Sequence, residues 1–191
     1  MSAAKIMPKV VWVAALGGFV TLLSPDLVAH LQKWESGPQR ALIVYADKLA
    51  GGLPTVCNGL TRHVTRTPIV VGERWAPEKC VVEEANALER VQRDLLACFK
   101  RLPPPSVLDM GSSHAWNFGA QATCGSGAMA AWNRGEWERG CQRISHGDDG
   151  RMVWSFTSHI DPATGKKVFT FVQGLANRRA DEATKCAGGL A

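Results

Sequence analysis

Two acids and a threonine flank a short Gly-rich segment in the first third of the chain. Glu35 and Asp47 precede Gly51 and Gly52, and Thr55 follows them. Two carboxylates in different surroundings suit the cleavage of a glycosidic bond, because one donates a proton to the leaving oxygen while the other, ionised, holds a water. Pairs of acids at this separation are more often solvated surface charges, so the pair alone does not identify a site.

Sequence motifs around these residues resemble those of one enzyme family. Tyr45-Ala46-Asp47, Gly51-Gly52 and Pro54-Thr55-Val56-Cys57-Asn58-Gly59 follow one another in an order similar to the active-site hairpin of phage-type lysozymes, glycoside hydrolase family 24. Further segments resemble that family's motifs in the family's order: Trp34-Glu35, Ser113-His114-Ala115-Trp116-Asn117-Phe118-Gly119, Ala131-Trp132-Asn133-Arg134-Gly135 and Gly174-Leu175-Ala176-Asn177-Arg178-Arg179-Ala180-Asp181-Glu182. The matching segments are spread over most of the chain, so we interpret it as similar to a lysozyme-like endolysin.

The resemblance implies a catalytic role for each of the three residues. Glu35 would be the general acid, Asp47 would orient the attacking water and stabilise positive charge on the sugar, and Thr55 would hold the same water. The implied reaction is hydrolysis, with inversion, of the β-1,4 bond between N-acetylmuramic acid and N-acetylglucosamine in peptidoglycan. The spacings around Asp47 are longer than in the family, and the alternative is that Asp47 is a turn residue.

The resemblance also implies substrate-binding residues, namely Asn58, Asn117 and Arg178. Arg178 resembles an arginine that pairs near the catalytic Glu, and the alternative is a surface ion pair with Asp181 or Glu182. Asn117 would line the sugar-binding cleft or, as we favour, cap a helix.

Two other functions remain open on the residues alone. A lytic transglycosylase of the same scaffold would use Glu35 without Asp47 or Thr55, because no water attacks in that reaction. A catalytically inactive, membrane-tethered protein would bind the cell wall without cleaving it.

The composition favours one folded domain with an anionic partner. The chain has 191 residues, 46% of them hydrophobic, and a net charge of +5, which suits a packed core and association with a negatively charged polymer. Peptidoglycan fits this description. The basic residues form no long run, so we expect no nucleic acid as a partner. We also expect no cofactor, no metal and a monomeric protein.

Six cysteines are dispersed along the chain without a CxxC pair. This pattern favours disulfides in an oxidising compartment over a zinc site, and the alternative is six reduced thiols in a cytosolic protein. The residues alone do not choose among the pairings. Disulfide-bearing family members carry cysteines at four similar positions, so the resemblance implies the pairs Cys57–Cys80 and Cys141–Cys186, together with Cys98–Cys124.

The N-terminus predicts export. Lys5 and Lys9 precede an apolar run, Val10–Leu23, that is short for a membrane span and rich in Gly and Ala. It resembles the signal-anchor-release leaders of some endolysins, which would place the protein at the inner membrane or in the periplasm of a Gram-negative host. The alternatives are a cleaved signal peptide and a buried core helix.

The predicted fold is α+β and mainly α-helical: a lysozyme-like fold with a small β-hairpin lobe and an N-terminal hydrophobic helix. We expect residues 1–30 to form the signal-anchor segment and residues 31–191 the catalytic domain. A helix should end at Glu35, and a hairpin should carry Asp47 and Thr55 on opposite arms facing a cleft. Apolar spacing predicts a helix over Val81–Leu102, followed by a helix capped by Ser106 with Asp109. Residues 151–171 should form a second hairpin, which we interpret as an edge decoration rather than a wall of the cleft.

Overall fold

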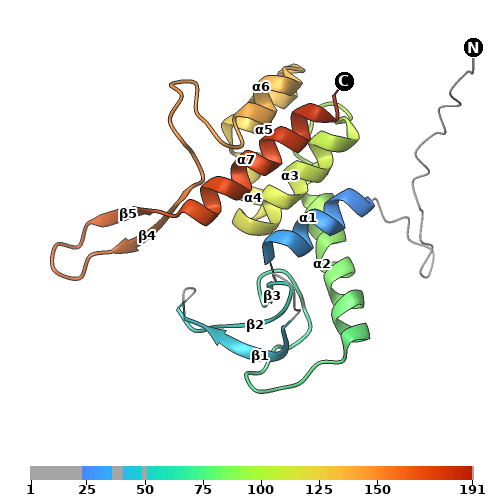
Figure 1. The fold of residues 1–191 in the computed structure, drawn as a ribbon, viewed down its shortest axis with the longest axis vertical. Coiled ribbons are helices and arrows are strands. Elements are labelled where there is room, and N and C mark those ends of the chain that lie inside the picture. Colours follow the sequence, from blue (N-terminus) through green and yellow to red (C-terminus); the bar gives the residue numbers. More distant parts are fainter. Residues whose placement is uncertain (1–22, 36–40, 49–50, 191) are drawn as a thin grey trace, which may run out of the picture.

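The computed structural model describes residues 23–35, 41–48 and 51–190. A group of helices forms one lobe, a small sheet forms a second, and a separate hairpin projects from the helical lobe (Figure 1). In chain order the elements are α1 (Pro25–Glu35), β1 (Ala41–Asp47), β2 (Leu53–Cys57), β3 (Leu60–Thr61), α2 (Pro77–Leu96), α3 (Pro105–Phe118), α4 (Ala120–Cys124), α5 (Gly127–Arg134), α6 (Trp137–Gln142), β4 (Phe156–Ile160), β5 (Lys167–Phe171) and α7 (Gln173–Gly188). The expected mainly helical α+β architecture is confirmed.

Helix α1 begins at a polar cap and ends at Glu35, as its apolar spacing predicts. The Ser24 hydroxyl accepts a hydrogen bond from the Leu27 N–H at 3.0 Å, which satisfies an otherwise unpaired backbone donor. Leu27, His30 and Leu31 are buried, so α1 packs into the core from its first turn. All but the last residue of the apolar run 10–23 lies outside the described residues. In the part of the chain that the structure describes, no helix is long and apolar enough to cross a membrane.

The small lobe is an antiparallel sheet in the order β1-β2-β3. The predicted turn between β1 and β2 contains Gly51 and Gly52, which both have positive φ angles that glycine adopts without steric cost. Pairing of Tyr45 with Thr55 and of Asp47 with Leu53 sets the register, so Asp47 and Thr55 do lie on opposite arms. A disulfide between Cys57 and Cys80 ties this lobe to α2.

Three sequence-based expectations for the helical lobe are wrong. Helix α2 begins at Pro77 rather than Val81 and ends at Leu96 rather than Leu102, because proline is well suited to a first helical turn and Cys98 lies outside the helix in a disulfide with Cys124. Helix α3 begins at Pro105, so Ser106 lies inside it and does not cap it. The Ser106 hydroxyl instead donates to the Cys186 carbonyl oxygen of α7 at 2.9 Å.

Helix α7 lies against the other helices and completes the core. It packs against α3 and α6, and a disulfide between Cys141 and Cys186 links its last turn to α6. The three disulfides are those that the resemblance implied. The predicted second hairpin is confirmed as β4 and β5, and β5 leads directly into the first turn of α7 (Figure 1).

Candidate active site

Glu35 lies at the end of α1, where its carboxylate meets Arg178 of α7. The distance from Arg178 Nη1 to Glu35 Oε1 is 2.5 Å, and the side chains are 4% and 16% exposed respectively. Gly59 lies on the other side of the carboxylate: a β-carbon at this position would be 2.9 Å from Glu35 Oε2. The carboxylate is therefore confined between a buried guanidinium and a backbone that has no room for a side chain.

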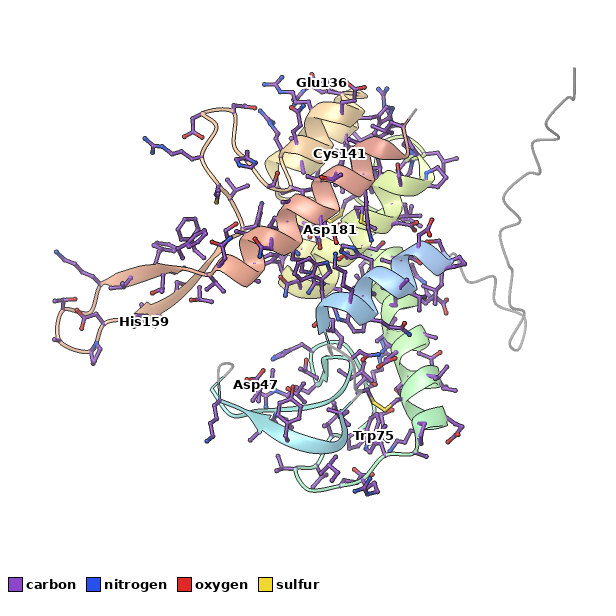
Figure 2. The ribbon with its side chains drawn as sticks, viewed as in Figure 1. Asp47, Trp75, Glu136, Cys141, His159 and Asp181 are labelled. Carbon is purple, nitrogen blue, oxygen red and sulfur yellow. A yellow bond between two sulfur atoms is a disulfide. The ribbon has the colours of Figure 1, made fainter. Side chains whose placement is uncertain are left out.

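A second contact holds the end of α1 against α7. Lys33 Nζ lies 2.7 Å from Asp181 Oδ2, and Trp34 Nε1 donates to the same oxygen at 2.9 Å. Asp181 lies near the middle of α7, in the region where α1 approaches it (Figure 2). The residues just before Glu35 and Glu35 itself are thus all paired with α7, which fixes the direction in which the carboxylate points.

Arg178 is itself held by a buried network around Glu182. Glu182 Oε1 lies 3.2 Å from Arg178 Nε and 2.6 Å from Arg179 Nη2, and the Ser113 hydroxyl donates to it at 2.6 Å. Burial alone would raise the pKa of Glu182, but His30, the two arginines and Ser113 together lower it. The ionised Glu182 therefore anchors Arg178 beneath Glu35. The alternative of a surface ion pair is wrong, because Arg178 and Glu182 are both buried.

Asp47 and Thr55 share one face of the β1–β2 hairpin. Tyr45 pairs with Thr55, and side chains two residues apart on a strand point to the same side, so Tyr45, Asp47 and Thr55 lie on a common face. Figure 2 shows Asp47 near the tip of this hairpin. Thr55 is buried, and its hydroxyl donates to the Leu53 carbonyl oxygen at 3.0 Å. The Thr55 oxygen is therefore oriented as an acceptor for a further hydrogen bond.

Both acids influence the pKa of Tyr45. Partial burial raises the pKa of the Tyr45 phenol, and the negative charges of Asp47 and Glu35 raise it further. Both carboxylates are therefore close enough to act on one hydroxyl group. Glu35 lies against Gly59 of the small lobe, and Asp47 and Thr55 share a face of the β1–β2 hairpin in the same lobe.

The other two predicted binding residues lie in different settings. Asn58 is buried, and its backbone N–H donates to Glu84 Oε1 at 2.8 Å. It lines a cavity of about 270 Å³ together with Trp116 and residues of α1 and α2. Asn117 is exposed in the last turn of α3. Gly119 ends α3 and precedes α4, so the expectation that Asn117 caps a helix is wrong.

The described ranges contain no group of three or more His, Cys, Asp or Glu side chains that could hold a metal ion. A paired glutamate, a second acid and a threonine oxygen acceptor around an open face suit proton donation to a leaving group and activation of a water.

Sequence reasoning missed the roles of Tyr45, Gly59 and Ser113 in this region, and it named Glu182 only as a surface partner of Arg178. Tyr45 and Gly59 stood inside the hairpin motif, but nothing in their spacing showed that both lie near Glu35. Ser113 and Glu182 stood inside separate motifs. Their contact depends on the packing of α3 against α7, which the sequence motifs do not report. Of these residues, Gly59 alone gives a signal in the sequence: a glycine in a tight turn indicates a positive φ, and the φ of Gly59 is +84°.

The fold resembles those of several solved structures. The endolysin from Escherichia coli O157:H7 phage FAHEc1 has a TM-score of 0.68 and 22% identity, over 86% of this chain and 92% of that one. The muramidase domain of SpmX from Asticaccaulis excentricus has a TM-score of 0.63 and 18% identity, over 85% and 95%. A mutant of P22 lysozyme has a TM-score of 0.60 and 17% identity, over 85% and 96%. These similarities show that the chain has a lysozyme-like fold.

Sequence comparison identifies the family. No curated protein is significantly similar to this chain in sequence. The model of the family described as phage lysozyme matches residues 33–182, a range that contains Glu35, Asp47, Thr55 and Arg178. Since the match covers well over half of the chain, the chain belongs to the phage lysozyme family.

Proposed function

We propose that the chain hydrolyses the β-1,4 bond between N-acetylmuramic acid and N-acetylglucosamine, with Glu35, Asp47 and Thr55 as its catalytic residues. Family membership supports the coarser part of this proposal, a glycoside hydrolase that cleaves peptidoglycan. The observation that supports the finer part is the pairing of Glu35 with buried Arg178 on one side and its contact with Gly59 on the other, in the sheet whose β1–β2 hairpin carries Asp47 and Thr55.

In the proposed reaction, Glu35 donates its proton to the glycosidic oxygen as the bond from that oxygen to the sugar's anomeric carbon breaks. A water attacks the same carbon from the opposite face. Asp47 accepts one proton of this water, and the Thr55 oxygen accepts a hydrogen bond from the other. The products are a new reducing end and a free hydroxyl. Glu35 is left ionised and Asp47 protonated, and exchange with solvent restores both.

Charge placement supports these roles. The half-buried Asp47 lies at the end of β1, and its carboxylate would stabilise the positive charge that develops on the sugar ring. Arg178 faces the carboxylate that Glu35 becomes after it gives up its proton. We propose that Arg178 acts through Glu35, because a buried guanidinium has little surface for a sugar. Asn58 and Asn117 remain proposed substrate-binding residues.

We further propose that the protein acts as a monomer outside the cytoplasm. Its family acts on the cell wall, so the protein needs access to the periplasm, and residues 10–23 would supply export and a tether to the inner membrane. The three disulfides support an oxidising compartment.

The test is an analysis of the products released from purified peptidoglycan by the wild type, Glu35→Gln and Asp47→Asn. Both substitutions keep the shape of the side chain and remove its ability to hold the required charge or proton. We expect ordinary reducing ends from the wild type and a loss of at least about 100-fold in each variant, since general acid–base catalysis contributes about 10²–10⁴-fold.

Two results would contradict the proposal. Anhydro-muramyl products, with Asp47→Asn still active, would identify a lytic transglycosylase. Binding to peptidoglycan without any product from the wild type would identify a cell-wall-binding protein that lacks the chemistry.

A further inference from the structure

The β4–β5 hairpin exposes several large apolar side chains to solvent. Every residue of both strands is exposed. Phe156, Ile160, Phe169 and Phe171 have between 41% and 64% of their surface exposed. An isolated two-stranded hairpin is marginally stable in water, and clustered exposed apolar side chains mark contact surfaces.

The strand register collects these side chains on one face. Phe156 pairs with Phe171, Ser158 with Phe169, and Ile160 with Lys167, and alternate residues on a strand share a face. We call this surface, which comprises Phe156, Ser158, Ile160, Lys167, Phe169 and Phe171, the aromatic face. The opposite face carries Thr157, His159, Val168 and Thr170 and has no aromatic ring other than the imidazole of His159.

The base of the hairpin is fixed to the helical lobe. Trp154 packs edge-on against His114 with ring centroids 4.7 Å apart and lies 5.0 Å from the Phe118 ring. Ser155 is buried, and its carbonyl oxygen accepts a hydrogen bond from the Val172 N–H at 2.8 Å. Trp154 has a φ of +57°, a conformation that costs a non-glycine residue about 1–2 kcal/mol. A base that is strained and packed against the helical lobe, beneath exposed strands, points to a surface held in a set position.

The hairpin is continuous with the candidate active site. Only Val172 separates β5 from α7, and Arg178, the partner of Glu35, lies roughly 8 Å farther along the helix axis. The β4–β5 and β1–β2 hairpins project to the same side of the molecule (Figure 1). His159 on the former and Asp47 on the latter lie on this side (Figure 2).

We propose that the aromatic face binds the glycan strand of peptidoglycan beyond the sugars at the cleavage point. The faces of pyranose rings carry C–H groups, and aromatic rings stack on such surfaces. Within the hairpin Lys166 and Lys167 outnumber Asp161, and this local positive charge suits the carboxylates of peptidoglycan stem peptides. The inference rests on the proposed function, because the polymer must also occupy the region of Glu35.

The position of the hairpin argues for glycan over lipid as the occupant. Helix α1 begins on the side of the molecule opposite the hairpin (Figure 1). A tether attached ahead of α1 would therefore join the protein on the side away from the hairpin.

The test compares Phe169→Ser/Phe171→Ser with a matched control on the opposite face of the same strand, Val168→Ser/Thr170→Ala. Each full-length variant is assayed for reducing-end release from insoluble sacculi and from a soluble muramyl tetrasaccharide that spans only the cleavage point. We expect the aromatic-face variant to lose about tenfold in activity on sacculi, equal to ~1.4 kcal/mol. Its activity on the tetrasaccharide, and both activities of the control, should stay unchanged. Melting temperatures should agree within about 2 °C, since all four positions are exposed.

A binding assay separates this inference from the proposed function. In a Glu35→Gln background, which leaves the glycan intact, the aromatic-face substitutions should lower the fraction of protein that pellets with sacculi. That loss supports the inference even if the wild type releases no reducing ends, a result that would refute only the proposed reaction.

Four results would overturn the inference. The first is equal pelleting and equal hydrolysis by the aromatic-face variant and its control, and the second is an equal loss of activity on sacculi and tetrasaccharide. The third is a loss of binding that occurs only with phosphatidylglycerol vesicles, measured by the same pelleting assay. The fourth is a wild-type dimer, measured by its mass in solution, that the aromatic-face substitutions dissociate.

Discussion

Substitution of Gly59 by alanine should damage catalysis more than stability. Gly59 has a φ of +84°, where a residue with a β-carbon costs about 1–2 kcal/mol. The new β-carbon would stand 2.9 Å from Glu35 Oε2, closer than carbon and oxygen approach without repulsion, so the carboxylate must move. Arg178 holds the other carboxylate oxygen at 2.5 Å, so the movement disturbs the ion pair as well. Because a shift of about 1 Å at a reacting group can cost about 100-fold, we expect kcat to fall between about 10-fold and 100-fold.

Gly72→Ala provides the matched control. Gly72 has a φ of +89°, and a β-carbon there would meet no atom within 4 Å. Both variants should lose about 1–2 kcal/mol of unfolding free energy in urea titrations, and only Gly59→Ala should lose kcat on sacculi. Equal kcat values for Gly59→Ala and the wild type would refute the placement of Glu35 against this turn. Equal losses of kcat in the two variants would show that the effect comes from the strained backbone alone.

Three further predictions concern the supporting structure. Arg178→Met should lower the unfolding free energy by about 3–5 kcal/mol, because it removes the partner of Glu35 and one of the two buried arginines that pair with Glu182. In urea titrations Arg151→Met, at an exposed position, should stay within about 0.5 kcal/mol, and a similarly small change for Arg178→Met would contradict the network. Burial, opposed only in part by Glu182, lowers the pKa of His114 to about 3 from an ordinary value of 6.5, so the unfolded chain binds a proton that the folded chain does not and stability falls as pH drops from 6.5 towards 3. His114→Asn should reduce the slope of unfolding free energy against pH by up to about 1.4 kcal/mol per pH unit in that window, and an unchanged slope would refute the buried neutral imidazole. Replacement of Cys98 and Cys124 by serine should cost about 3 kcal/mol under oxidising conditions, because the disulfide closes a loop with a sequence separation of 26; a cost below about 0.5 kcal/mol would show that this pair contributes little.

Local signals in the sequence predicted the elements that carry the candidate site. The apolar spacing before Trp34 placed Glu35 at a helix end, and the Gly-rich turn placed Asp47 and Thr55 on opposite arms of a hairpin. These features depend on neighbours in the chain, which periodicity and turn residues report.

Features that depend on distant contacts could not be predicted in the same way. The role of Ser106 as a donor to the Cys186 carbonyl, rather than as a helix cap, requires α3 to lie against α7. The burial of Arg178 likewise requires Glu182 and Ser113 to meet from separate helices.

The most direct test of the central claim is the anomeric configuration of the first product, read by proton NMR within seconds of adding enzyme to a soluble muramyl oligosaccharide. If Glu35 donates the proton while Asp47 and Thr55 direct a water to the opposite face, the new reducing end appears first as the α-anomer and then mutarotates. A β-anomer formed first would require a covalent intermediate or attack from the same face. That result would contradict the roles proposed for Asp47 and Thr55.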